Sequence, residues 1–295
     1  MTSGAAAVLE VEPVIRLGIF VGLVLALGVS EVLAPRRTPS LPRLKRWPGN
    51  LCVAVINTVI LRMIFPTAAV GIALLAENKG WGLFNVSGFP AWIAIPSSVI
   101  ILDFVIYLQH VLFHAAPLLW RLHRMHHADI DIDVTTGIRF HPFEMAFSMC
   151  IKLGVVMVLG VPALAVLIFE VLLNATSMFN HANVRIPLRL DNMLRWLLVT
   201  PDMHRVHHSW HPEETNSNFG FNLPWWDRLF RTYRDQPRDG HQGMTIGLVE
   251  FRDPGWERLD RMLIQPFIGR PRSPEVESGS VVKGSSGGPG KANNP

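Results

Sequence analysis

Long apolar stretches separated by short polar segments dominate the first 180 residues. Residues 14–34 are mainly Leu, Val, Ile, Gly and Ala, and two further apolar runs cover residues 51–76 and 91–114. Because a helix needs about 20 apolar residues to cross a bilayer, each run predicts a membrane-spanning helix. Glu10 and Glu12 stand where a signal peptide would carry basic residues, so we expect the first span to be retained.

A fourth apolar run, residues 145–179, predicts a hairpin. One straight span here would place the histidine-rich segments before and after it about 30 Å apart, on opposite sides of the membrane. Gly160 and Pro162 interrupt the run near its middle, so we expect it to enter the membrane and return. The fold class that follows is all-α: an integral membrane helical bundle of about three spans plus the hairpin.

Histidines recur at helical spacing in three short segments, HVLFH, HRMHH and HRVHH. Residues three and four apart share one helical face, so each segment directs its imidazoles to one place. Eight of the chain's 12 histidines lie in these segments: His110, His114, His123, His126, His127, His204, His207 and His208. Since a structural zinc site uses four ligands and a catalytic one three, eight or more histidines indicate a dinuclear metal site.

Other polar residues in apolar surroundings are candidates for the same site. His181 ends a polar stripe with Glu170 and Asn174 on the returning arm of the hairpin, and we expect it to bind metal. Glu170, Asn174 and Asp103 are candidate partners of the ligands, although a buried structural contact is an equal alternative for Asp103. His141 precedes Pro142 and is a ligand, a partner of a ligand or a helix cap.

Composition and charge agree with a membrane enzyme. The chain is 49% hydrophobic and 17% charged, and its mean hydropathy is +0.28. The net charge of +4 comes without a basic stripe interleaved with aromatics, which argues against nucleic acid and for anionic lipid head groups. Five basic residues follow the first span, which predicts a cytoplasmic loop and places the histidines on the cytoplasmic side: Arg36, Arg37, Arg43, Lys45 and Arg46. The two cysteines form no redox or iron–sulfur motif, so any electrons must come from another protein.

The remaining chain is expected to cover the site. Residues 186–199 are amphipathic and predict a helix at the head groups. Thr200 and Pro201 predict the start of the helix that bears HRVHH, and the polar sequence after Ser209 predicts a cytosolic cap. We expect four regions: transmembrane helices in residues 1–90, a catalytic domain in 91–235, a C-terminal cap segment in 236–271 and a disordered tail in 272–295.

The ordered histidine segments, with PDMHRVHHS followed by TNSNFGFNLPWWDRLFRTYR and NHAN around His181, closely resemble the fatty acid hydroxylase / sterol desaturase superfamily. WRLHRMHHADIDIDVTTGIRFHPFE looks like its bacterial branch, and the resemblance covers residues 101–234. It implies nine metal ligands: His110, His114, His123, His126, His127, His181, His204, His207 and His208. Two departures are visible, Phe219 where the family commonly has Tyr and Arg231 where Gly is usual.

The resemblance also implies an activity. Members are integral-membrane non-heme di-iron oxygenases, so we expect two iron ions, O₂ as co-substrate and hydroxylation or desaturation of a sterol-like, hopanoid, carotenoid or fatty-acyl lipid. Electrons would come from a ferredoxin or cytochrome b5-type donor and its reductase, in a bacterial inner membrane. A histidine-rich metal carrier or sensor and a zinc-dependent lipid hydrolase on the same scaffold are the alternatives, because imidazole suits several metals.

Overall fold

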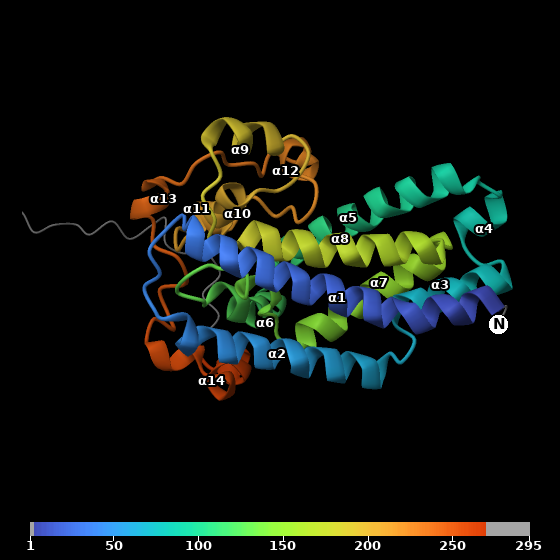
Figure 1. Ribbon diagram of the computed structural model, residues 1–295, viewed down its shortest axis with the longest axis horizontal. Coiled ribbons are helices and arrows are strands. Elements are labelled where there is room, and N and C mark those ends of the chain that lie inside the picture. Colours follow the sequence, from blue (N-terminus) through green and yellow to red (C-terminus); the bar gives the residue numbers. More distant parts are fainter. Residues whose placement is uncertain (1–2, 270–295) are drawn as a thin grey trace, which may run out of the picture.

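Helices account for almost all the regular structure of the described residues. The computed structural model describes residues 3–269, so the tail predicted to be disordered lies outside the described residues. The long helices run along the length of the molecule in Figure 1. They are α1 (Ser3–Leu33), α2 (Arg43–Ile64), α3 (Ala68–Lys79), α5 (Ala91–Ala115), α7 (Pro142–Leu159) and α8 (Ala163–His181), with the short α4 (Leu83–Ser87) between α3 and α5.

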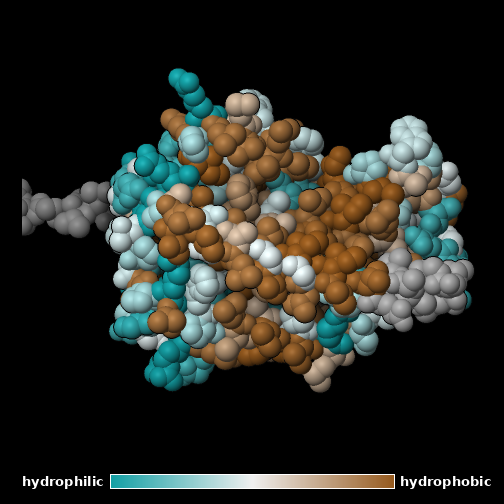
Figure 2. Space-filling model, viewed as in Figure 1, coloured by the Kyte–Doolittle hydropathy of each residue, from teal (hydrophilic) through white to brown (hydrophobic). Residues whose placement is uncertain are grey.

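Five helical segments among the described residues are long and apolar enough to cross a membrane. They are Val11–Leu33, Arg43–Ser87, Ala91–Ala115, Pro142–Leu159 and Ala163–His181. The side chains of Val11–Leu33 are mostly on the outside, since only 6% of the apolar window in this part of α1 is buried. Apolar surface covers the long helices in Figure 2, as expected where lipid replaces water.

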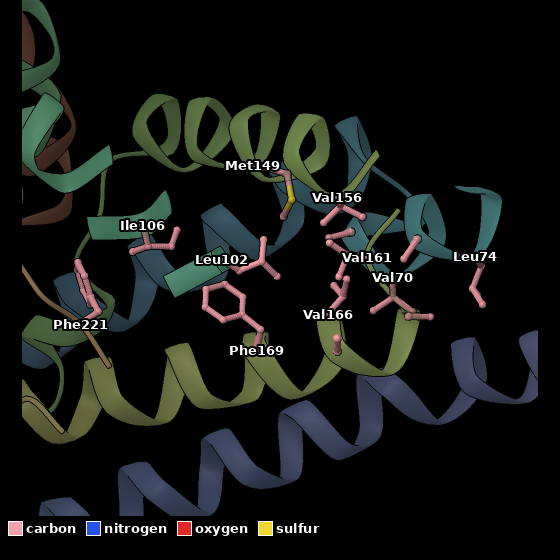
Figure 3. Packing of buried hydrophobic residues seen from close by; sticks show 14 residues of the cluster. Val70, Leu74, Leu102, Ile106, Met149, Val156, Val161, Val166, Phe169 and Phe221 are labelled. Atoms are coloured by element: carbon pink, nitrogen blue, oxygen red, sulfur yellow. The ribbon is translucent and has the colours of Figure 1, made fainter. Parts of the chain in front are cut away.

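The predicted hairpin is present as α7 and α8. Gly160 ends α7 in the left-handed conformation (φ 64°), and Pro162 precedes the first residue of α8. A Cβ on Gly82 would lie 2.1 Å from the backbone nitrogen of Gly160, so the turn packs tightly against the connection between α3 and α4. Behind it, apolar side chains of α3, α5, α7 and α8 form a core that runs from Leu74 to Phe221 (Figure 3).

The second span differs from the expected continuous helix. It divides into α2, which ends at Ile64, and α3, which begins at Ala68. Pro66 lies in the break, and a proline can neither donate the helical hydrogen bond nor avoid the carbonyl four residues earlier.

Short helices gather at one end of the bundle and form a cap (Figure 1). They include α6 (Pro117–His127), η1 (Thr136–Ile138), α9 (Leu188–Leu194), α10 (Pro201–His207), α11 (Pro212–Thr215), α12 (Trp225–Leu229), α13 (Gly240–Gly243), η2 (Pro254–Glu257), α14 (Leu259–Ile264) and η3 (Gln265–Phe267). Thr200 caps α10 by accepting from the backbone N–H of Met203, as the sequence predicts.

A buried arginine fastens the cap to the bundle. Arg46 on α2 makes a bidentate contact with Asp129 (2.7 and 2.8 Å) and a third with Asp133 (2.6 Å). Burial alone would raise the pKa of Asp129, but Arg46 and Arg139 outweigh it and lower this pKa to about 2. The loop of residues 128–141, which follows the HRMHH segment, is thereby held against α2.

Candidate metal centre

Nine histidines from four helices meet where the long helices reach the cap. α5 carries His110 and His114, α6 carries His123, His126 and His127, His181 is the last residue of α8, and α10 with its C-cap carries His204, His207 and His208. Every one of these side chains is at most 4% exposed. The return of α8 to the end where α5 leaves the bundle brings the early and late segments together.

The nine imidazoles divide into two groups that could each hold a metal ion. One contains His110, His114, His123, His127 and His207, and the other contains His126, His181, His204 and His208. Within each group, one ring nitrogen of every residue lies within 4.8 Å of those of the others.

The orientation of the rings indicates which nitrogen faces the centre. His110 and His207 donate from Nδ1 to the carbonyls of Phe219 and Ser217, both at 2.7 Å, and His181 donates to the carbonyl of Ser177 at 2.6 Å. A carbonyl only accepts, so the proton of each neutral ring is on Nδ1 and the lone pair is on Nε2.

These Nε2 atoms face one another. Nε2 of His110 lies 3.1 Å from those of His123 and His207, and Nε2 of His181 lies 3.1 Å from those of His126, His204 and His208. Two nitrogen ligands about 2.1 Å from one metal lie roughly 3.0–3.4 Å apart, depending on the coordination geometry. Facing lone pairs repel each other unless a cation lies between them, so the arrangement fits two metal ions.

Burial keeps the histidines of the cap in the form that binds metal. It lowers the pKa of His207 to about 3, and it lowers the pKa values of His126, His204 and His208 well below 6.5. These rings are therefore neutral near pH 7, and neutral imidazole is the form that binds a metal.

The other four candidates have different partners. His141 caps α7 by accepting from the backbone N–H of Phe143 (3.2 Å), which is one of the three roles expected for it. Asp103 accepts from the indole of Trp226 (2.8 Å), and its role is to join α5 to α12.

Glu170 and Asn174 lie further along α8, away from the ligands. Glu170 pairs with Lys152 (2.6 Å) and Arg16 (2.8 Å), and Asn174 donates to the backbone carbonyl of Glu170. Neither hydrogen-bonds to a histidine of the two groups within the described residues, so the polar stripe of α8 connects helices over most of its length.

Two partners of the histidines were not among the candidates. Glu144 lies 2.6 Å from Nδ1 of His123, and the side-chain oxygen of Asn216 lies 3.3 Å from Nδ1 of His114. Glu144 could be recognised in the sequence only as an acidic residue in the first turn of a helix. The contact with His123 depends on how α7 crosses α6, which no local pattern reports.

Aromatic rings surround the centre. Phe140 stacks on His126 (4.5 Å between ring centroids), Trp120 lies 4.8 Å from His114 and Phe221 lies 5.0 Å from His110. These rings exclude water from the imidazoles and strengthen electrostatic interactions there.

Comparison with known proteins identifies the region that contains these histidines. The family model described as fatty acid hydroxylase matches residues 95–232, which include all nine. Residues 95–232 are therefore similar to the fatty acid hydroxylase family. With this match and five candidate spans, the chain is a multi-pass membrane protein.

Curated relatives match the chain over part of their own length. The chain is 31% identical over 161 residues to ornithine lipid hydroxylase OlsE of Rhizobium tropici (54% of this chain, 47% of the relative). It is 28% identical over 193 residues to alkylglycerol monooxygenase of Xenopus tropicalis (64% of this chain, 41% of the relative). The chain thus spans less than half the length of these two relatives. No solved structure gives a significant match.

The two departures from the family pattern lie in this matched region. The ring of Phe219 lies 5.5 Å from His110, 5.1 Å from His114 and 5.5 Å from His207. Arg231 has a φ of 62°, a conformation that glycine adopts without strain. Phe219 therefore forms part of the wall of the metal centre, whereas the backbone strain at Arg231 affects the stability of the cap.

Proposed function

We propose that this protein is an O₂-dependent hydroxylase or desaturase of a membrane lipid that uses two iron ions. The observation that carries the proposal is the set of facing Nε2 atoms at 3.1 Å in two buried histidine groups. The family match supports the reaction class, and the names of the relatives, ornithine lipid hydroxylase and alkylglycerol monooxygenase, support a lipid substrate.

In this proposal the nine histidines are the ligands, and residues 91–235 form the catalytic domain between the transmembrane helices of residues 1–90 and the cap segment of residues 236–271. Glu144 orients His123 and increases the basicity of its ring, so that Nε2 binds a metal more strongly. Backbone carbonyls fix the rings of His110, His181 and His207. Bound iron would supply the redox chemistry that lets O₂ react with an unactivated C–H bond.

The stoichiometry of the reaction requires a partner. Inserting one oxygen atom into C–H and reducing the other to water consumes two electrons and two protons per O₂, and forming an alkene with two molecules of water consumes the same. The chain offers two cysteines, Cys52 and Cys150, on separate helices and no disulfide. We therefore propose a ferredoxin or cytochrome b5-type donor with its reductase, acting at the cytoplasmic face of a bacterial inner membrane.

Metal content and O₂ consumption of the purified protein test this proposal. We expect two irons per chain, O₂ consumption that requires a reductant, and a lipid product that has gained one oxygen or lost two hydrogens by mass spectrometry. His126→Ala and His207→Ala should each lose metal and activity, whereas His211→Ala should keep both, because His211 contacts Asp239 outside the two groups.

The alternatives give different results in the same measurements. Bound zinc with lipid hydrolysis in the absence of O₂ would indicate a hydrolase. Readily exchangeable metal without any lipid product would indicate a carrier. Full metal content and activity in both His126→Ala and His207→Ala would contradict the ligand assignment.

A further inference from the structure

An exposed apolar surface extends over α9, the segment after it and α12. Six of its side chains are 48–68% exposed: Leu188, Met193, Trp196, Leu197, Leu229 and Phe230. We name this surface the α9–α12 platform. In Figure 1 these two helices lie at the top of the cap, and in Figure 2 apolar surface covers them and adjoins that of the long helices.

The platform is fixed in place by polar contacts beneath it. The indole of Trp225 donates to the carbonyl of Trp196 (2.8 Å), and the guanidinium of Arg228 lies 4.2 Å above the ring of Trp196. Arg195 pairs with Asp191 (2.6 Å). Asp191 and Arg195 are each 1% exposed, so their contact lies on the inner side, and the apolar side chains are held on the outer side.

The platform is continuous with a membrane-spanning helix. Phe230 stacks on Phe104 (5.8 Å) and Tyr107 (5.6 Å), both on α5. Leu108 and Leu112 of α5 are each 45% exposed on a segment apolar enough to span the bilayer. The surface of α5 that faces lipid therefore leads directly onto the platform.

Unpaired arginines accompany this apolar surface. Arg185, Arg189 and Arg231 are exposed, and none forms an ion pair with another residue in the described part of the chain. The carboxylate of Asp235, which is exposed nearby, is already paired with Arg195 (2.9 Å). Apolar and aromatic side chains beside free arginines are typical of a surface that rests on anionic lipid.

We infer that the α9–α12 platform is immersed in the leaflet on the metal side of the membrane, with its arginines at anionic head groups. Removing apolar side-chain area from water is favourable in proportion to that area, so six half-exposed side chains together favour immersion over contact with water. A bilayer fits better than a partner protein because the platform continues a lipid-facing helix. This placement is independent of the reaction that the metal centre catalyses.

Spin labels on the protein in lipid vesicles test the immersion. Cys52 and Cys150 are first replaced by Ser, and labels are then attached to Met193→Cys and Leu229→Cys. Leu25→Cys on α1, 64% exposed, is the reference for lipid, and Glu213→Cys on α11 is the reference for water. We expect both platform labels to be relaxed by O₂ more than by a water-soluble nickel complex, as at Leu25. The opposite preference, as at Glu213, would overturn the proposal.

Vesicle composition tests the role of the arginines. In vesicles with about one-third phosphatidylglycerol, Arg185→Gln/Arg189→Gln should move the Met193→Cys label toward the surface. In pure phosphatidylcholine the same double substitution should change the depth little, because neutral lipid offers the arginines no net charge. If the label had the same depth with and without the arginine substitutions in both kinds of vesicle, the binding of anionic head groups would be contradicted.

Discussion

Each HxxHH segment divides its histidines between the two groups. In α6, His123 and His127 belong to one group and His126 to the other. In the segment of α10 the order is reversed, since His207 belongs to the first group and His204 and His208 to the second. Successive residues of a helix are about 100° apart. The histidines at i and i+4 therefore point in nearly the same direction, and the histidine at i+3 points in a different one.

The clustering of the histidines could be predicted from their spacing, but their assignment to two groups could not. Spacing specifies which rings share a face of their own helix. The partners from other helices depend on how α5, α6, α8 and α10 cross, and this is set by packing among residues far apart in the sequence. The same limit applies to Glu144, whose contact with His123 joins two helices.

Glu144 provides a test at the residue scale. Replacing it with Ala should lower metal affinity about 10–100-fold, because the charged acceptor that orients His123 is lost. Glu144→Gln keeps a hydrogen-bond acceptor without the charge, so its metal affinity should lie between that of Glu144→Ala and that of the native protein. Metal content after titration with a competing chelator measures the effect, and the exposed Glu213→Gln is the control. Native affinity in Glu144→Ala would show that the contact does not support the ligand.

Arg231 provides a second test, of stability alone. Its φ of 62° strains any residue with a Cβ by about 1–2 kcal/mol, and glycine removes this strain at an entropic cost of about 0.5–1 kcal/mol. Arg231→Gly should therefore raise the free energy of unfolding by up to about 1.5 kcal/mol. Arg231→Ala loses the same side chain but keeps the Cβ, so it should not stabilise. Thermal unfolding in detergent compares the two, and equal melting temperatures would contradict this explanation.

Among the elements, the long helices could be predicted well and the loops could not. Runs of apolar residues identify the spans, and Gly160 with Pro162 marks the turn of the hairpin. The role of Arg46 was missed: the sequence indicates a basic residue at the membrane surface, whereas the structure buries it completely against Asp129. A charge becomes buried only when distant partners satisfy it, and those partners follow from tertiary structure.

The loop of residues 128–141 should therefore depend on Arg46. Arg46→Met leaves the carboxylates of Asp129 and Asp133 without this partner. It should lower the free energy of unfolding by about 3–5 kcal/mol. Adding Asp129→Asn removes one of these charges and should recover part of the loss. Arg43→Met is the control: Arg43 is partly exposed and lies 3.6 Å from Glu31, so its loss should lower the free energy of unfolding less than the loss of Arg46 does.

Unfolding in denaturant, followed by circular dichroism, measures these differences. The pH dependence has a defined sign, because the pKa of Asp129 is lowered from 3.8 to about 2 in the folded state. Its contribution is complete above about pH 4 and is lost as the pH falls toward 2. A loss in Arg46→Met no larger than in Arg43→Met would show that the loop is held by other contacts.

For the whole molecule, the arrangement of the spans sets which side of the membrane holds the metal centre. The connection from α1 to α2 carries Arg36 and Arg37 at the metal end, whereas residues 80–90, between α3 and α5, include no basic residue and Lys79 is the last residue of α3. Basic residues near the ends of spans favour the cytoplasmic side. The helices α3 and α11 lie at opposite ends of the molecule (Figure 1), and they carry the exposed residues Lys79 and Glu213.

Single cysteines at these two positions test the orientation in a chain whose Cys52 and Cys150 are replaced by Ser. In spheroplasts, a membrane-impermeant maleimide should label Lys79→Cys, and it should label Glu213→Cys only after the membrane is opened. The reverse pattern would place the histidines outside the cell, where a ferredoxin or cytochrome b5-type donor could not reach them. Labelling of both positions in intact spheroplasts would show that the helices do not separate the two ends across the bilayer. Either result would remove the proposed electron source while leaving the geometry of the metal centre unaffected, so the two parts of the proposal can fail separately.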